Sequence, residues 1–122
     1  MKHLFLLIAV ATLVSACSAA SGPKIPLASG QYVFQHRFAE HPAIPSIQLQ
    51  VTISGSHIAV ANPTASDSFP AGIIAEGQLM WHPASKQWII GNQASDKFAQ
   101  DVGGCSDGPE AVDLVGKIYW TC

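Results

Sequence analysis

Apolar and polar residues alternate over residues 47–53, and this alternation is the clearest pattern in the chain. A period of two is typical of an antiparallel strand with one face buried and the other in water. Gly55 and Ser56 follow, and a two-residue loop that begins with glycine favours a type II′ hairpin turn. Folding the chain at this turn places Ile53 opposite Ile58 on the apolar face, so the pattern and the turn predict the same register.

A second hairpin is predicted from residues 73–81 and 87–91, joined by a turn at 83–86. Folding there places Trp81 opposite Trp88, and we expect this pair to contribute strongly to the core because each indole buries a large apolar area. In the first strand of this hairpin, the residues predicted to face inward are Ile73, Leu79 and Trp81. Those predicted to face outward are Glu76, Gln78 and His82.

Two further strands are predicted at the ends of the domain. Residues 31–38 place four rings in one row, Tyr32, Phe34, His36 and Phe38. The last strand places Ile118, Trp120 and Cys122 on one face and Lys117, Tyr119 and Thr121 on the other, more polar face. Residues 110–115 fit either a short helix or a strand, and residues 92–104 show no period. Because no long helical period occurs after residue 16, residues 31–122 are predicted to form an all-β, mainly antiparallel domain, a small barrel or curved sheet of five to seven strands.

The N-terminal residues have a different character. Lys2 gives a positive start, and an apolar run follows that is about half of the ~20 residues a membrane-spanning helix requires. Such a segment is typical of a secretory signal that is removed. Its last residues, Val14-Ser15-Ala16-Cys17, resemble the lipobox of bacterial lipoprotein signal peptides, with valine where leucine is commoner.

The resemblance implies a processed and acylated protein. A helical signal peptide of residues 1–16 would be removed, and Cys17 would carry a diacylglyceryl thioether and an acylated amine. Residues 17–30 are small, polar and proline-bearing, so they are predicted to form a flexible tether. Ser18 implies lipid anchoring at the periplasmic face of the outer membrane rather than in the inner membrane. The alternative is an ordinary signal peptide and an unmodified thiol at Cys17.

The cysteine count fits the lipoprotein resemblance. The chain has three cysteines, and an odd cysteine in an exported protein needs an explanation. Acylation of Cys17 leaves Cys105 and Cys122, which we expect to form a disulfide in an oxidising envelope compartment. Closing this loop would stabilise the fold by about 3 kcal/mol in the chain-entropy model.

Charge limits the range of partners. Lys2 is one of six basic residues, so removal of the leader leaves five basic and eight acidic residues and a formal charge of −3. The scattered lysines form no basic stretch for nucleic acid and no polybasic cluster for anionic lipids. Membrane attachment is therefore expected to come from the acyl chains on Cys17.

Candidate chemistry is sparse. His36, Glu40 and His41 offer metal-ligand atoms, but the strand end between them lacks the helix that aligns ligands in zinc-enzyme motifs, so neither a metal centre nor a cofactor is predicted. His36 is expected to point inward and make one hydrogen bond. Tyr119, placed on the polar face, is the aromatic residue expected to contact a partner. His57 and His82 are predicted to be exposed beside turns, and the acidic residues of the last third lack the spacing of a calcium loop.

These observations predict a lipoprotein whose β-domain binds another envelope component, a protein or a glycan, without catalysis. No catalytic serine motif is present, and no cysteine stays free if Cys17 is acylated and the other two are bridged. The alternatives are a small-ligand carrier with an apolar barrel interior, an inhibitor of lysozyme-type hydrolases, and an enzyme centred on His36 and Glu40.

Overall fold

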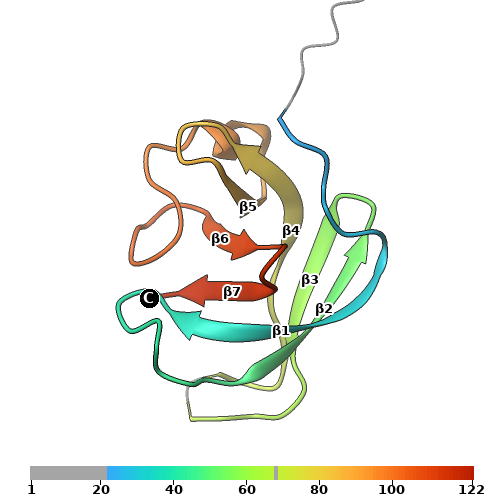
Figure 1. The fold of residues 1–122 in the computed structure, drawn as a ribbon, viewed down its shortest axis with the longest axis vertical. Helices are drawn as coiled ribbons and strands as arrows, with labels where there is room; N and C mark the ends of the chain where they lie inside the picture. The colour runs from blue at the N-terminus through green and yellow to red at the C-terminus, as the bar shows by residue number, and fades with distance from the viewer. Residues whose placement is uncertain (1–21, 68) are drawn as a thin grey trace, which may run out of the picture.

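The computed structural model describes residues 22–67 and 69–122, so the expected signal peptide, the lipobox and Cys17 lie outside the described residues. The described chain forms a closed barrel (Figure 1). Its strands are β1 (Gly30–Phe38), β2 (Gln48–Ser54), β3 (His57–Asn62), β4 (Gly72–His82), β5 (Gln87–Gly91), β6 (Glu110–Asp113) and β7 (Ile118–Thr121).

Strand order in the barrel follows chain order. Each consecutive pair of strands is antiparallel, and the ring closes through a parallel pairing of β1 with β7, in which His36 lies beside Tyr119. The predicted all-β class is thus confirmed, and of the two predicted forms the structure has the barrel. Residues 110–115, which fitted either a helix or a strand, begin as strand β6.

Both predicted hairpins have the predicted registers. Ile53 lies opposite Ile58 across β2 and β3, and Gly55 has a φ of 62°, as the first loop position of a type II′ turn requires. Across β4 and β5, Trp81 lies opposite Trp88. Local alternation and turn chemistry were therefore sufficient to predict the registers of these two hairpins.

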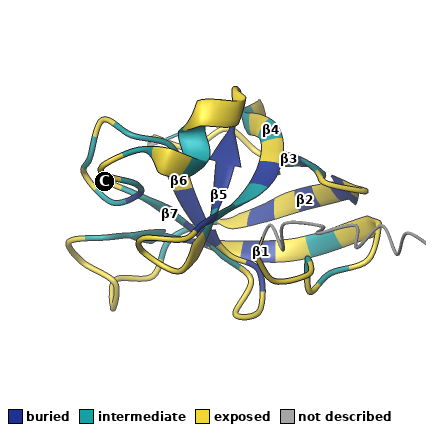
Figure 2. Ribbon diagram, turned by 90° about the horizontal axis from the view of Figure 1, so that it is seen from above, coloured by how far each residue is buried: buried dark blue, intermediate teal, exposed yellow. Residues whose placement is uncertain are grey.

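Alternate residues of every strand fill the barrel interior. The buried core joins β1, β2 and β3 to the later strands, and Figure 2 shows the alternation of buried and exposed positions along β1 and β2. Its members are Phe34, Leu49, Val51, Ile53, Ile58, Val60, Leu79, Ile90, Val112, Leu114 and Tyr119. Barrels of so few strands are filled by their own side chains.

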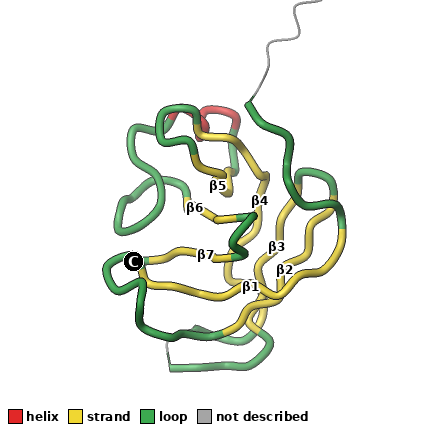
Figure 3. Tube along the Cα trace, in the orientation of Figure 1, coloured by secondary structure: helices red, strands yellow, loops and turns green. Residues whose placement is uncertain are grey.

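The chain between β5 and β6 covers the outer face of this part of the barrel. It contains a 3-10 helix, η1 (Ala94–Phe98), red in Figure 3, which the sequence did not predict. The Asp96 carboxylate accepts hydrogen bonds from the backbone N–H groups of Asn92 and Gln93, and these bonds lower its pKa. Ile89, on the outer face of β5, is nevertheless buried; η1 contacts this strand, and Gly103 lies against Ala111, the residue that pairs with Ile89.

Two residues of β4 differ from the prediction: His82 points outward as predicted but is covered, and Ile73 lies on the opposite side. His82 is buried, because its Nε2 atom bonds the Ala99 carbonyl oxygen of the covering segment at 2.7 Å. Ile73 is exposed, because the register of β3 and β4 shifts at Val60 and Ala61. Such a bulge adds one residue to β4 and reverses the direction of the side chains that precede it.

The segment before β1 is packed rather than free. Ile25 and Leu27 pack against the core, and the Tyr32 hydroxyl donates to the Ala28 carbonyl oxygen at 2.7 Å. A Cβ atom at Gly22 would overlap the indole of Trp81, so the backbone there lies directly on that ring. From residue 22 onward, the expected tether therefore belongs to the folded domain.

Candidate functional site

His36 is a structural residue at the centre of the β1–β7 seam. It is fully buried, with Nδ1 2.6 Å from the Ser46 hydroxyl and Nε2 2.7 Å from the Thr121 hydroxyl. It thus makes two hydrogen bonds rather than the one expected. The ring meets those of Phe38 and Phe69 edge to face, with centroids 4.5 and 4.7 Å away. Burial, together with the Arg37 charge, lowers the pKa of His36.

Glu40 and His41 do not join His36 in a site. Both are exposed in the turn after β1, and both ring nitrogens of His36 already bond to hydroxyl groups. The Glu40 carboxylate instead lies within 4.8 Å of the sulfur atoms of Cys105 and Cys122. Because these sulfur atoms are bonded to each other, they are not thiolate ligands, and this cluster is not a metal site in the oxidised protein.

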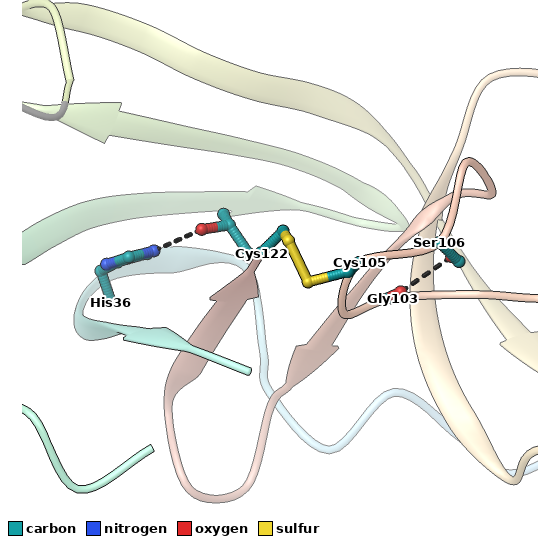
Figure 4. The surroundings of a disulfide bond; sticks show 6 residues. His36, Gly103, Cys105, Ser106 and Cys122 are labelled. Carbon is teal, nitrogen blue, oxygen red and sulfur yellow. Dashed lines mark hydrogen bonds between the residues drawn. A yellow bond between two sulfur atoms is a disulfide. The ribbon is translucent and has the colours of Figure 1, made fainter. Parts of the chain in front are cut away.

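The expected disulfide is present between Cys105 and Cys122 (Figure 4). It joins β7 to the loop after η1, and this loop is held by a hydrogen bond from the Ser106 hydroxyl to the Gly103 carbonyl oxygen at 2.8 Å. Cys122 follows Thr121, which bonds His36, so the disulfide and the histidine fix the same end of β7.

Tyr119 lies in the core instead of on the polar face. It is only 2% exposed and donates its hydroxyl hydrogen to Glu110. Burial and this carboxylate raise the pKa of Tyr119 well above its usual range. Its direction is set by its neighbours His36 in β1 and Val112 in β6. A buried ring of this kind offers no surface to a partner.

Two open grooves on the β4–β5 hairpin form the candidate site. Trp81 and Trp88, with ring centroids 5.4 Å apart and planes 68° apart, line both grooves. The first groove, of about 370 Å³, is completed by the segment before β1, by β4 and by η1, through Pro23, Ile25, Leu79, Met80, Ala94 and Lys97.

The second groove, of about 280 Å³, extends from the same indoles toward β6 and β7. Trp120 lines it, so all three tryptophans of the chain border one of the two grooves. Val115, from the β6–β7 turn, and Lys86 add an exposed methyl surface and a positive charge. Trp81, Trp88 and Trp120 are each only partly buried, so they are open to a ligand.

Sequence analysis assigned these tryptophans to the core and missed their role as groove walls. The pairing of Trp81 with Trp88 was correctly predicted, and it placed the two indoles together. The hydrophobic pattern could not show what surrounds these indoles. Strand β5 ends at Gly91, and the segment before β1 crosses at Gly22, so that the indoles stay partly uncovered.

The described residues leave no buried side-chain nitrogen or oxygen without a hydrogen-bond partner. In the part of the chain that the structure describes, no helix is long and apolar enough to cross a membrane. No family model matches the chain, and no match was found among curated proteins or solved structures.

Proposed function

We propose that this chain is a lipid-anchored envelope protein, acylated at Cys17, whose β-barrel is a non-catalytic binding domain. Its binding surface is the pair of grooves that share Trp81 and Trp88. The lipobox-like residues 14–17 support the anchor. The single observation that carries the binding role is that all three tryptophans border these two adjoining open grooves.

Tryptophan is one of the side chains enriched where proteins bind partners. It offers a large apolar ring together with one N–H donor, and concentrates binding energy in a small area. The groove rims add Lys86, Lys97 and Asp113, polar groups of the kind that orient a ligand on an apolar floor. This combination supports recognition of another envelope component.

The carrier alternative has less support. A carrier would enclose its ligand in the apolar barrel interior, but Phe34, Leu49 and Leu79 there are buried members of a continuous packed core. A ligand held there would have to displace side chains that already fill the interior. The open grooves therefore support surface binding better than enclosure.

Two measurements test the proposal. Intact-mass analysis of protein purified from cell membranes should show loss of residues 1–16 and addition of a diacylglyceryl group and an acyl chain, and a Cys17→Ser variant should lack both additions. An unmodified thiol at Cys17 would refute the anchor.

The grooves are tested by tryptophan fluorescence of the mature Cys17→Ser chain. Isolated membranes or peptidoglycan sacculi should protect the indoles from acrylamide quenching, and the Lys97→Glu exchange at the groove rim should reduce this protection. An Ile73→Ser variant is the matched control, since Ile73 is exposed and lines neither groove. If neither fraction protects the indoles, the grooves are not the binding surface.

A further inference from the structure

We infer that the tryptophan-bearing face docks on the phospholipid headgroup layer of the same bilayer that holds the acyl anchor. We define the tryptophan face as the two grooves, the exposed ring of Phe98 and residues 22–25. The inference rests on the proposed function, because it requires acylation at Cys17, and it names the partner of the same surface.

The first argument is the short connection to the anchor. The first described residue, Gly22, lies on the Trp81 ring, and Gly22 is five residues beyond Cys17. Five residues of fully extended chain span at most about 18 Å. A free tether of the predicted length, ending at residue 30, would reach more than twice as far. The folded segment therefore holds the Trp81 side of the barrel close to the acylated residue.

The second argument is the chemistry of this face. Phe98 on η1 is 73% exposed, and the ammonium group of Lys97 lies 5.2 Å from the centre of its ring. Tryptophan is enriched at the level of lipid headgroups, and lysine there extends its charge toward phosphate while its methylenes stay on apolar surface. The aromatic rings and the lysine are thus of the types found at a membrane interface.

The third argument is the distribution of charge. The described chain has five basic residues, and Lys86 and Lys97 line the grooves while Lys24 lies between Pro23 and Ile25 of the first groove wall. These lysines are distant in the sequence, which is why no basic cluster was visible there. Asp113 also lines the second groove, but three lysines against one carboxylate still give the tryptophan face the sign that attracts headgroup phosphates.

Weak contacts suffice for this docking because the anchor makes it intramolecular. A surface tethered within about 18 Å of the membrane experiences a high effective concentration of headgroups. The acyl chains would provide attachment, and the tryptophan face would set which side of the barrel faces the lipid.

The test uses the acylated mature protein in vesicles of phosphatidylethanolamine and phosphatidylglycerol, with and without brominated acyl chains. Bromine quenches nearby indoles, and every tryptophan of the chain borders the grooves, so the intrinsic fluorescence reports on this face. We expect brominated vesicles to reduce the emission at least twofold. The Lys97→Glu/Phe98→Ser double variant should lose most of this quenching, whereas Ile73→Ser should retain it.

Vesicles of phosphatidylcholine alone provide the charge control. Quenching in the brominated form of these vesicles should be at least twofold weaker, because they carry no net negative charge. Emission that is equally strong in brominated and unbrominated vesicles would overturn the membrane inference.

The two proposals can fail separately. If bromine does not quench the indoles but sacculi or an added envelope protein protects them from acrylamide, the docking on lipid is wrong and the binding function stands. If the purified cellular protein lacks acyl chains, the anchor itself is wrong, and the argument from the distance between Cys17 and Gly22 no longer applies.

Discussion

His36 should make the stability of the barrel depend on pH, and its replacement by phenylalanine should remove most of that dependence. The imidazole is fully buried, and its pKa is lowered from 6.5 by burial and by the Arg37 charge. Its hydrogen bonds do not oppose protonation, because the hydroxyls of Ser46 and Thr121 can accept as well as donate. The cost of protonation in the folded state is therefore mainly loss of hydration.

The sign of the effect follows from proton binding. Below about pH 6.5 the unfolded chain takes up a proton at position 36 that the folded chain does not, so acidification favours unfolding. The contribution is fully present above the unfolded pKa. It falls by at most about 1.4 kcal/mol for each pH unit until the lower pKa of the folded state is reached.

The His36→Phe variant changes stability in a second way that does not depend on pH. It leaves the Ser46 and Thr121 hydroxyls without their ring partners, which costs about 1–3 kcal/mol for each group that stays buried and unpaired. We therefore expect a less stable variant whose free energy of unfolding varies less between pH 5 and pH 7. The two effects are separable because only the loss of the imidazole titration changes how the free energy of unfolding varies with pH.

Urea unfolding followed by tryptophan fluorescence at pH 5, 6, 7 and 8 measures both effects. A His41→Ala variant is the control, because His41 is exposed in the turn after β1. Its free energy of unfolding should vary with pH as it does in the original protein. Equal slopes for the His36→Phe variant and the original protein would show that the buried imidazole is not the source of the pH dependence.

Three further changes test other parts of the fold. Replacing Cys105 and Cys122 by serine opens a connection across a sequence separation of 17, and urea unfolding should show a loss of about 3 kcal/mol. A Phe34→Ala variant removes a fully buried ring and should lose about 3–5 kcal/mol, measured in the same way. A Gly22→Ala variant should displace the segment that lies on Trp81 and shift tryptophan emission to longer wavelength, with the barrel still folded.

Matched controls separate these effects from general damage. Val33 precedes Phe34 but is 59% exposed, so Val33→Ala should change stability by less than about 0.5 kcal/mol. Gly72 has a φ of 103°, close to the 89° of Gly22, but an added Cβ there meets no other atom. If Gly72→Ala shifts the emission as much as Gly22→Ala, backbone strain rather than displacement from Trp81 is the cause.

Much of the barrel could be predicted because its signals are local. In β2 and β3, alternation and the Gly55 turn agree, and a hairpin needs little else. The direction of Tyr119 was mispredicted because β7 is four residues long, with large side chains on both faces. Its burial depends on pairing with β1, whose partner residue is distant in the sequence. In a strand this short, the alternation of side chains does not show which face is buried.

The chain between β5 and β6, which covers the outer face of the barrel, was not predicted for a related reason. His82 and Ile89 point away from the barrel interior, a direction that normally means exposure, and both are buried by the chain between β5 and β6. That segment has no hydrophobic period because it covers the sheet with a 3-10 helix and backbone contacts rather than a regular strand. The candidate site depends on the same layer, since η1 forms one wall of the first groove.

The packed segment before β1 connects the fold to the proposed function. A tether up to residue 30 would let the barrel adopt any orientation at the membrane, and no face would be preferred. Because Gly22 lies on Trp81 and Ile25 packs on the core, the connection from Cys17 is short and reaches the barrel beside the grooves. In the proposed anchored protein, the same contacts that bury apolar surface would thus restrict which face can meet the lipid. Loosening them in the Gly22→Ala variant should weaken quenching by brominated lipid even where the barrel keeps its stability.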